Sequence, residues 1–163
     1  MNAMTPSFAP ATLERDGIAA RIPHSGTMCL LDRLVRWDAE AIHCVTRTHL
    51  AMDNPLRTAS GLLAPNAIEY AAQAMALHGG LLATEGAPPS AGFLASARNV
   101  RLSVARLDAL SGDLQVHARR LSGDARQVLY EFNVNDAAGA PVAEGRAVVV
   151  LNTPLPETKA LSS

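Results

Sequence analysis

The sequence predicts an α+β fold in which an antiparallel sheet wraps around one long central helix. The helix is expected at residues 61–83, where the chain is almost wholly apolar and Pro65 suits a first-turn position that needs no amide donor. Strands are expected where β-branched residues recur and apolar side chains alternate with polar ones. Because several of the turns between these segments are short, neighbouring strands should pair antiparallel.

The expected elements are two short strands, the central helix and then four longer strands. A short helix at residues 11–22 would precede them, and residues 38–40 would form the turn of a first hairpin. One sheet with a single apolar helix must bury that helix against one of its faces, and a sheet that curls around the helix has the hotdog arrangement. The six strands are predicted at residues 34–37, 41–50, 93–105, 113–121, 127–135 and 142–151.

The composition suits a single domain with an aliphatic core. The chain has 163 residues, of which 48% are hydrophobic but only 4% aromatic, so alanine and branched aliphatic residues must fill the interior. The net charge is -1 and no basic run occurs, which argues against nucleic-acid binding. The domain is expected at residues 11–152, between a flexible N-terminus at residues 1–10 and a flexible tail at residues 153–163.

Three features predict a cytoplasmic protein. The first residues lack the basic region and the apolar core of a signal peptide. No run of about 18 apolar residues is present, so no membrane-spanning segment is expected. Cys29 and Cys44 have neither disulfide-framework nor metal-site spacing, and two free core thiols fit a reducing compartment.

One acid interrupts the apolar central helix. Glu69 and Gln73 are four residues apart, about one helical turn, so their side chains lie on the same face. Burying a carboxylate is unfavourable unless a partner pairs with it. Glu69 is therefore a candidate functional acid. The alternative is a structural glutamate that Gln73 or a loop amide holds in place.

Two segments resemble motifs of the bacterial hotdog 3-hydroxyacyl-acyl-carrier-protein dehydratases. IPHSGTMCLLDRL, residues 22–34, is similar to their opening P-H-R-x-P-M-L-L-L-D-R, and IEYAAQAMALHGG, residues 68–80, is similar to the E-x-x-A-Q segment of their central helix. The helix also resembles G-x-P-x-x-x-x-E-Y-x-A-Q-A-x-A-x-x-x-G, the pattern of the branch associated with aryl-polyene-type pigments. The resemblance spans roughly residues 20–150 and implies the hotdog fold.

The chain departs from the housekeeping fatty-acid dehydratases at their catalytic histidine. That histidine lies in an H-F-P-G loop about 14 residues before the helix glutamate, and the corresponding residue here is Pro55. No histidine occurs between His49 and His78. The glycine near the start of the family's helix is also replaced, since the local sequence is LAPNA. The base must therefore come from elsewhere in the chain.

Dehydration of a 3-hydroxyacyl thioester needs a base for the α-proton, an acid for the departing hydroxyl and donors for the thioester oxygen. The resemblance implies Glu69 as the acid, and His24, in the segment that matches the family's opening, is the first candidate for the base. Free backbone amides near the start of the helix are expected to be the donors, helped by the helix dipole. The expected substrate-binding residues are Ala64, Pro65, Asn66 and Gln73, and no metal or organic cofactor is required.

The histidines have alternative interpretations. His24 would otherwise be a loop residue that pins the sheet edge. His49 is the second candidate for the base, although a surface histidine at a strand end is its favoured interpretation. His43 and His117 lie on alternating strands and are expected to face solvent. His78 is expected to be a hydrogen-bonded histidine beneath a loop.

Other polar residues are expected to have structural roles. Asp32 and Arg33 match the family opening and are expected to form a local ion pair. Tyr70 is expected to pack or to hydrogen-bond at a subunit contact. Arg98 and Arg101 are expected on a solvated sheet face, with contact to a carrier protein as the alternative.

The resemblance implies conversion of a 3-hydroxyacyl thioester on acyl carrier protein to a trans-2-enoyl thioester, in secondary, polyene-type lipid biosynthesis. Two alternatives are a hotdog acyl thioesterase, in which Glu69 activates water, and a non-catalytic acyl-binding subunit of a dehydratase heterodimer. The missing loop histidine is compatible with the last of these. Because one helix cannot cover six strands, a homodimer with sheets joined edge to edge is expected, with a heterodimer as the alternative.

Overall fold

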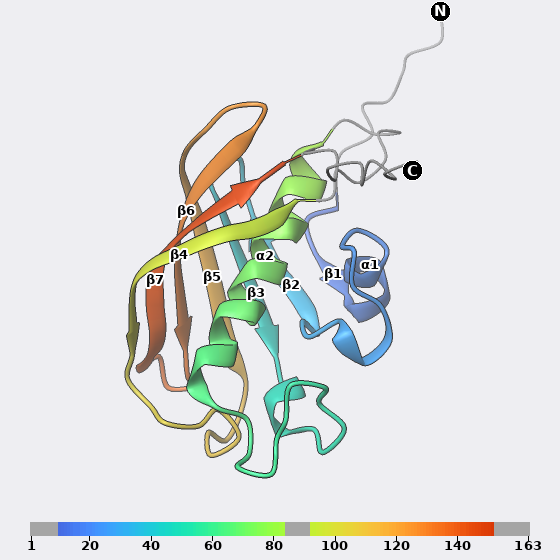
Figure 1. Ribbon diagram of the computed structural model, residues 1–163. Coiled ribbons are helices and arrows are strands. Elements are labelled where there is room, and N and C mark those ends of the chain that lie inside the picture. The colour runs from blue at the N-terminus through green and yellow to red at the C-terminus, as the bar shows by residue number, and fades with distance from the viewer. Residues whose placement is uncertain (1–9, 84–91, 152–163) are drawn as a thin grey trace, which may run out of the picture.

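A curved antiparallel sheet surrounds one long helix in the computed structural model, which describes residues 10–83 and 92–151. The helix is α2 (Ala67–Leu82), and a short helix, α1 (Arg15–Ala19), lies outside the sheet (Figure 1). This arrangement confirms the predicted α+β fold. The strands are β1 (Leu13–Glu14), β2 (Arg33–Trp37), β3 (Ala41–Thr46), β4 (Phe93–Leu102), β5 (Leu114–Gly123), β6 (Gln127–Asn135) and β7 (Pro141–Val150).

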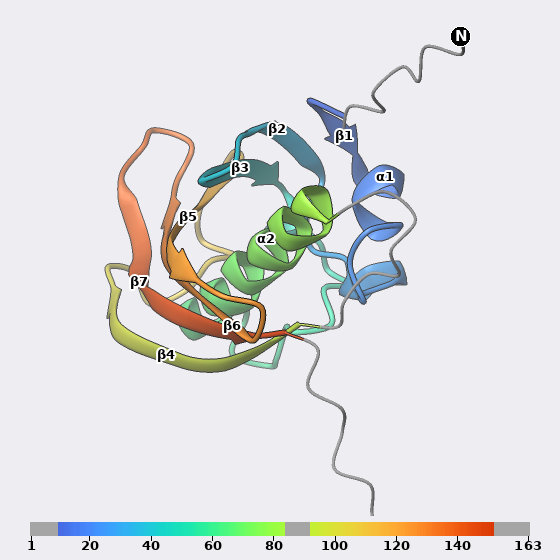
Figure 2. The same cartoon turned by 90° about the horizontal axis from the view of Figure 1, so that it is seen from above.

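The strand order in the sheet is β1-β2-β3-β5-β6-β7-β4, and every neighbouring pair is antiparallel. Figure 2 shows the sheet bending around α2, with β2 and β3 on one side of the helix and β4 on the other. The strand that follows α2 in the chain, β4, pairs only with β7 among the described strands. Its outer edge is therefore unpaired within the described part of the chain.

Most of the predicted strands are confirmed, and one observed strand, β1, was not predicted. The hairpin between β2 and β3 and the bounds of β6 agree with the sequence. The expected helix at residues 11–22 is partly wrong, because this segment contains both β1 and the five residues of α1. With only two residues, β1 is too short to show the alternation that identifies a strand.

The strand predicted at residues 41–50 ends early. Its pairing with β5 stops at Thr46, and the chain then forms a short 3-10 helix, Thr48–Leu50. The central helix also begins later than predicted. Gly61 has a φ of +94° and exchanges backbone hydrogen bonds with Thr58, so residues 58–61 make a turn and Gly61 is not part of the helix. Pro65 lies in a 3-10 turn, Ala64–Asn66, which leads into α2.

The core lies between α2 and the concave face of the sheet. It is mostly aliphatic, as expected, although Tyr70 and Phe132 are its largest fully buried side chains. Cys29 and Cys44 are buried free thiols, and burial raises the pKa of Cys44 to about 12. The expectation of core thiols is thereby confirmed.

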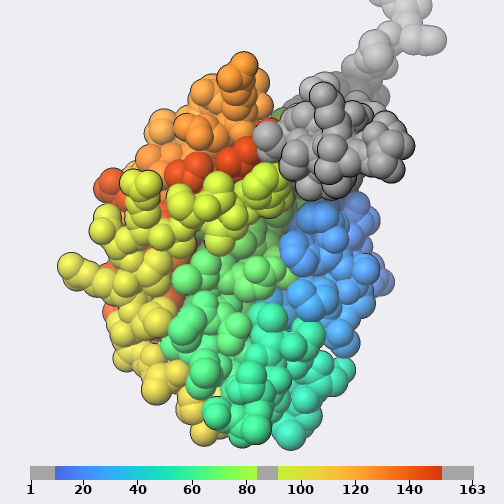
Figure 3. Space-filling model, in the orientation of Figure 1, coloured from blue at the N-terminus to red at the C-terminus, as the bar shows by residue number. Residues whose placement is uncertain are grey.

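One side of α2 is not covered by the sheet. Figure 3 shows helix atoms, in green, at the surface between β4 and the N-terminal segment. Ile68, Glu69, Ala72, Ala76 and Gly79 are partly exposed along this side. The acid singled out in the sequence therefore lies on the accessible face of the helix.

Some expectations fall outside the described residues. The flexible N-terminus expected at residues 1–10 has only Pro10 inside them, and the flexible tail expected at residues 153–163 has none. The loop after α2, residues 84–91, lies outside them as well. Among the described helices, none is both long enough and apolar enough to cross a bilayer.

Candidate active site

His24 and Glu69 meet on the accessible side of α2. The Nε2 atom of His24 lies 3.2 Å from Oε1 of Glu69, and the two side chains are 26% and 34% exposed. His24 lies just before a 3-10 turn, Gly26–Met28, while Glu69 is in the first turn of α2. The Nδ1 atom of His24 is buried and has no hydrogen-bond partner among the described residues. The candidate base and the candidate acid thus lie side by side and are partly exposed.

Gln73 ties the loop that follows His24 to the helix. Its side chain is fully buried; Nε2 donates to the carbonyl of Met28 at 2.7 Å and Oε1 accepts from the amide of Leu30 at 2.8 Å. Nε2 also lies 3.4 Å from Oε1 of Glu69. The expectation that Gln73 bonds loop backbone or orients Glu69 is confirmed by these contacts.

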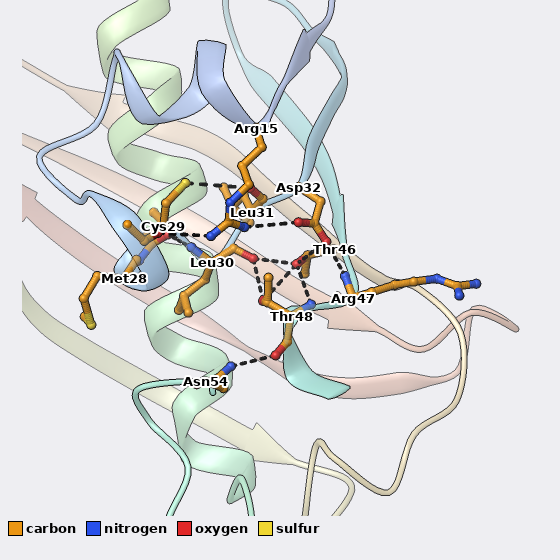
Figure 4. Close-up of polar contacts among 12 residues, drawn as sticks. Arg15, Met28, Cys29, Leu30, Leu31, Asp32, Thr46, Arg47, Thr48 and Asn54 are labelled. Atoms are coloured by element: carbon orange, nitrogen blue, oxygen red, sulfur yellow. Dashed lines mark hydrogen bonds and ion pairs between the residues drawn. The ribbon is translucent and has the colours of Figure 1, made fainter. Parts of the chain in front are cut away.

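A polar cluster beneath this loop fixes the other side of Leu30 (Figure 4). The hydroxyl of Thr48 donates to the carbonyl of Leu30 at 2.7 Å, and the hydroxyl of Thr46 donates to the same carbonyl. The hydroxyl of Thr48 also hydrogen-bonds the hydroxyl of Tyr70, which accepts a hydrogen bond from the side-chain amide of Asn54. Both polar groups of Leu30 are therefore bonded to side chains, the amide by Gln73 and the carbonyl by two threonines.

The tyrosine in this cluster corrects an expectation. Tyr70 is fully buried within one chain and bonds Thr48 and Asn54, so the predicted role at a subunit contact is wrong for its side chain. Burial raises the pKa of the Tyr70 phenol. It is therefore a structural group that helps to hold Thr48.

Asp32 pairs with a residue that the sequence did not suggest. The expected ion pair with Arg33 is wrong: Oδ1 of Asp32 lies 3.2 Å from Nη1 of Arg15, and Oδ2 accepts from the amide of Arg47. Arg15 also donates to the carbonyl of Gly26, two residues after His24. The pairing of Asp32 with Arg15 has no sequence signal, because only the fold brings α1 to this loop. The roles of Thr46 and Thr48 had a signal, since residues two apart in a predicted strand have their side chains on the same side.

The backbone amides before α2 are already bonded. The expectation of free donors there is wrong, because the amide of Ala64 donates to the carbonyl of Ala105, the amide of Asn66 donates to the carbonyl of Leu63, and Pro65 has no N–H. Contact of these three residues with substrate stays a prediction.

Comparison with known proteins identifies the family. The ApeP-like family, described as ApeP dehydratase, matches residues 17–161. The chain belongs to the ApeP-like dehydratase family. This confirms the resemblance to hotdog dehydratases that the motifs around His24 and Glu69 indicated. No curated protein sequence matches the chain.

Solved structures similar to this ApeP-like dehydratase share its fold. The dehydratase heterocomplex ApeI:P from Xenorhabdus doucetiae superposes with a TM-score of 0.74 at 24% identity, covering 86% of this chain and 92% of the other. A mutant of the thioesterase PA1618 from Pseudomonas aeruginosa gives 0.62 at 16% identity, covering 91% and 100%. The thioesterase HI1161 from Haemophilus influenzae gives 0.62 at 11% identity, covering 90% and 95%. The hotdog fold is thus shared with both dehydratases and thioesterases.

The second candidate base of this family member is inaccessible. His49 is completely buried, so its interpretation as a surface histidine is wrong. Its Nε2 atom bonds the carbonyl of Leu110 at 2.9 Å, and burial lowers its pKa. His49 forms no hydrogen bond with Glu69 among the described contacts. Of the two candidate bases, only His24 contacts the acid.

The remaining histidines have structural surroundings. His78 is buried between the hydroxyl of Tyr130 and the carbonyl of Asp38, at 2.7 and 2.8 Å, as expected for a hydrogen-bonded histidine. His43 and His117 are partly exposed, alternate with buried residues along their strands and stack on each other with ring centroids 4.1 Å apart. No group of three or more His, Cys, Asp or Glu side chains suited to a metal ion occurs within residues 10–83 and 92–151.

Proposed function

We propose that this chain dehydrates a 3-hydroxyacyl thioester on acyl carrier protein to a trans-2-enoyl thioester. His24 is the base and Glu69 the acid. The observation that carries the proposal is the 3.2 Å contact between His24 Nε2 and Glu69 Oε1, because it places one proton acceptor and one proton donor beside the same accessible surface. Membership of the ApeP-like dehydratase family supports the same reaction class.

Each side chain handles one proton in this mechanism. Neutral His24 removes the α-proton of the thioester through Nε2. The electron pair of the broken C–H bond forms the Cα–Cβ double bond, and the Cβ–O bond breaks. Protonated Glu69 donates its proton to the departing hydroxyl, which leaves as water. The products are an enoyl thioester, an imidazolium and a carboxylate.

The direct contact between the two groups also completes the cycle. After elimination His24 holds an extra proton, and its Nε2 atom lies 3.2 Å from Oε1 of Glu69, which has lost one. Transfer across this contact restores the neutral imidazole and the carboxylic acid. The pair therefore needs no outside acid or base between turnovers.

The acyl group is proposed to be slim and apolar, as in secondary, polyene-type lipid biosynthesis. Small residues line the accessible side of α2, since Ala72, Ala76 and Gly79 follow Glu69 along the helix. Acyl carrier protein is the proposed carrier of the substrate. No metal or organic cofactor takes part in the proposed steps.

A second hotdog subunit is the proposed partner. The outer edge of β4 is unpaired in the described chain, is ten residues long and carries the exposed side chains of Phe93 and Leu102. Such an edge readily pairs with a strand of another subunit. A homodimer and a heterodimer are both compatible with this edge, and the ApeI:P structure is a heterocomplex of related fold.

The test is a direct assay of the purified chain, alone and mixed with candidate hotdog partner subunits. We expect 3-hydroxyacyl carrier protein to lose one water by mass spectrometry, without release of free carrier thiol. Release of thiol without loss of water would indicate a thioesterase and contradict the proposal. Activity that survives in both His24→Ala and Glu69→Ala would contradict the assignment of the site.

A further inference from the structure

Arg15 connects the loop that carries His24 to the sheet. It is the first residue of α1, and its Nη2 atom donates to the carbonyl of Gly26 at 3.1 Å. Gly26 follows His24 by two residues. The Nη1 atom of the same side chain lies 3.2 Å from Oδ1 of Asp32, which directly precedes β2 (Figure 4). One guanidinium group therefore contacts both the His24 loop and the residue at the start of β2.

The carboxylate of Asp32 is a fixed anchor for this guanidinium group. Its Oδ2 atom accepts from the amide of Arg47 at 2.7 Å and lies 3.2 Å from the hydroxyl of Thr46. The backbone amide of Asp32 donates to the carbonyl of Val45, so the main chain at this point is also bonded to β3. Because Asp32 is held on several sides, it can hold Arg15 in one place.

The two-residue strand β1 brings Arg15 to this carboxylate. Glu14 pairs with Arg33 in antiparallel register, so the next residue after Glu14 and the residue before Arg33 lie opposite each other. These two residues are Arg15 and Asp32. Ile18, one turn further along α1, is completely buried in the core and anchors the short helix. A short strand and a short helix thus place one side chain beside the His24 loop.

Few side chains hold the His24 loop. Within residues 10–83 and 92–151, only two side chains bond the backbone of residues 24–28: Arg15 bonds the carbonyl of Gly26, and Gln73 bonds the carbonyl of Met28. Of these two contacts, the one that Arg15 makes is nearer to the histidine in the chain. The position of the imidazole ring therefore depends on Arg15.

Arg15 lies outside the motifs that identify the family. It precedes residues 17–161, which match the ApeP-like family. In the motif P-H-R-x-P-M an arginine directly follows the histidine, whereas Ser25 follows His24 here. The loop itself thus has no guanidinium group, and α1 supplies one from another part of the chain.

We propose that Arg15 is a positioning residue that holds His24 at its distance from Glu69. The inference rests on the proposed function, in which His24 is the base and Glu69 the acid. Arginine suits this role because its planar group presents donors to two acceptors at once, whereas the ammonium group of lysine is a single point charge. Displacing a reacting group by about 1 Å can lower a rate by about 10²-fold.

The test combines kinetics with a direct view of the histidine. Arg15→Ala and Arg15→Lys are compared with the unchanged protein, and kcat and KM for 3-hydroxyacyl carrier protein are measured separately. The imidazole resonances of His24, assigned by nuclear magnetic resonance with His24→Gln, report its surroundings whether or not the protein is active. Arg119→Ala is the control, because Arg119 also forms an exposed ion pair, 3.5 Å from Glu131. Urea unfolding of each variant verifies that it is folded.

We expect kcat to fall by at least roughly tenfold in Arg15→Ala, with KM little changed, because the base is displaced while substrate contacts remain. The His24 resonances should move in the same variant. Guanidinium ion at millimolar concentration should restore part of kcat and return the resonances, and it should not raise kcat in Arg119→Ala. Arg15→Lys should resemble Arg15→Ala, since one ammonium group does not replace both contacts.

Two results would overturn the role of Arg15. One is an unchanged kcat in Arg15→Ala together with unmoved His24 resonances. The other is a lowered kcat that guanidinium ion does not restore, with the resonances still unmoved, because the loss would then come from general destabilisation. If Arg15→Ala does not fold, Arg15→Lys decides the question through the same measurements.

The two proposals fail separately. If the unchanged protein dehydrates no 3-hydroxyacyl substrate but the His24 resonances move in Arg15→Ala and return with guanidinium ion, Arg15 holds the ring and the dehydratase function fails. If dehydration occurs equally fast in Arg15→Ala and in the unchanged protein, the function stands and the role of Arg15 fails.

Discussion

His24 and Glu69 are two partly exposed side chains that contact each other where Nε2 of His24 lies 3.2 Å from Oε1 of Glu69. Groups of this kind contribute little to the stability of a fold, because solvent screens an exposed ion pair. In the proposed mechanism their geometry matters for proton transfer. Substitutions at this pair should therefore separate activity from stability.

Glu69→Gln should abolish most of the activity while the protein stays folded. Glutamine keeps the size and the hydrogen-bonding capacity of the side chain but cannot supply a proton to the departing hydroxyl. Loss of general acid catalysis lowers rates by about 10²–10⁴-fold. The measurement is kcat for 3-hydroxyacyl carrier protein, alongside the melting temperature. Activity within a factor of two of the unchanged protein would rule out Glu69 as the acid.

Gln73→Met, unlike Glu69→Gln, should mainly lower the stability of the fold. The buried amide bonds the carbonyl of Met28 and the amide of Leu30, and methionine fills a similar volume without replacing either bond. Each orphaned buried group typically costs about 1–3 kcal/mol, so we expect the free energy of unfolding to fall by at least that amount. Urea unfolding measures it, and Gln73→Glu, which keeps one acceptor, is the comparison. An unchanged free energy of unfolding would mean that water replaces the amide.

At the level of the elements, α2 and the longer strands follow from side-chain patterns. The alternation in β6 predicts its bounds, and the apolar run predicts most of α2. The sequence does not predict β1, which has two residues and exists only because β2 pairs with it. It also places the end of β3 too late, because Thr48 leaves the sheet to bond the carbonyl of Leu30. Long-range polar contacts of this kind have no periodic signature.

In the candidate site, too, local sequence patterns predict some features, and contacts with distant segments determine the others. Glu69 and Gln73 could be placed on one helix face from their spacing alone, and the motif around His24 suggested a base. The amide of Ala64 could not be judged in this way, because its partner, the carbonyl of Ala105, comes from a distant segment. The burial of His49 likewise depends on the loop that carries Leu110.

The outer edge of β4, which is unpaired within residues 10–83 and 92–151, leads to a prediction about assembly. Replacing both Phe93 and Leu102 by glutamate places charge on the exposed edge strand without removing a buried side chain, because these residues are 50% and 42% exposed. We expect the dimer dissociation constant to rise by at least roughly tenfold, since charged edge strands resist pairing. Light scattering over a dilution series measures it. Met52→Glu, at a side chain 79% exposed on a loop, is the control.

If the double variant and the control dimerise equally well, β4 does not form the interface. The circular dichroism spectrum of the double variant should match that of the unchanged protein. If the spectrum shows a loss of β-structure, the double variant is misfolded. The single variant Leu102→Glu is then used in its place to test dimerisation.

For the whole molecule, four partly or fully buried histidines predict how stability depends on pH. Burial is the main cause of a lowered pKa at His43, His49, His78 and His117, and the pKa of His117 falls to about 4 with a further contribution from His43. Unfolding exposes these rings and returns their pKa values to about 6.5. The unfolded chain therefore binds more protons than the folded chain between about pH 6.5 and pH 4.

Stability should accordingly be fully present above about pH 6.5 and should decline as the pH falls toward 4. His117→Gln removes one of the four groups, so its free energy of unfolding should decline less steeply across this window. Urea unfolding at several pH values measures both slopes. Equal slopes in the variant and the unchanged protein would show that His117 does not contribute to acid sensitivity.

The two halves of the proposed acid-base pair belong to one polypeptide, and this has a genetic consequence. Where an active site is shared between subunits, two different inactive alleles can complement each other, because hybrid assemblies rebuild an intact centre. Here a hybrid of His24→Ala and Glu69→Gln chains holds no intact pair in either subunit. Co-expression of the two should restore no activity above that of each alone. Each intact subunit would then act as a self-sufficient catalytic unit, whose partner is free to diverge in sequence at its own equivalents of these positions.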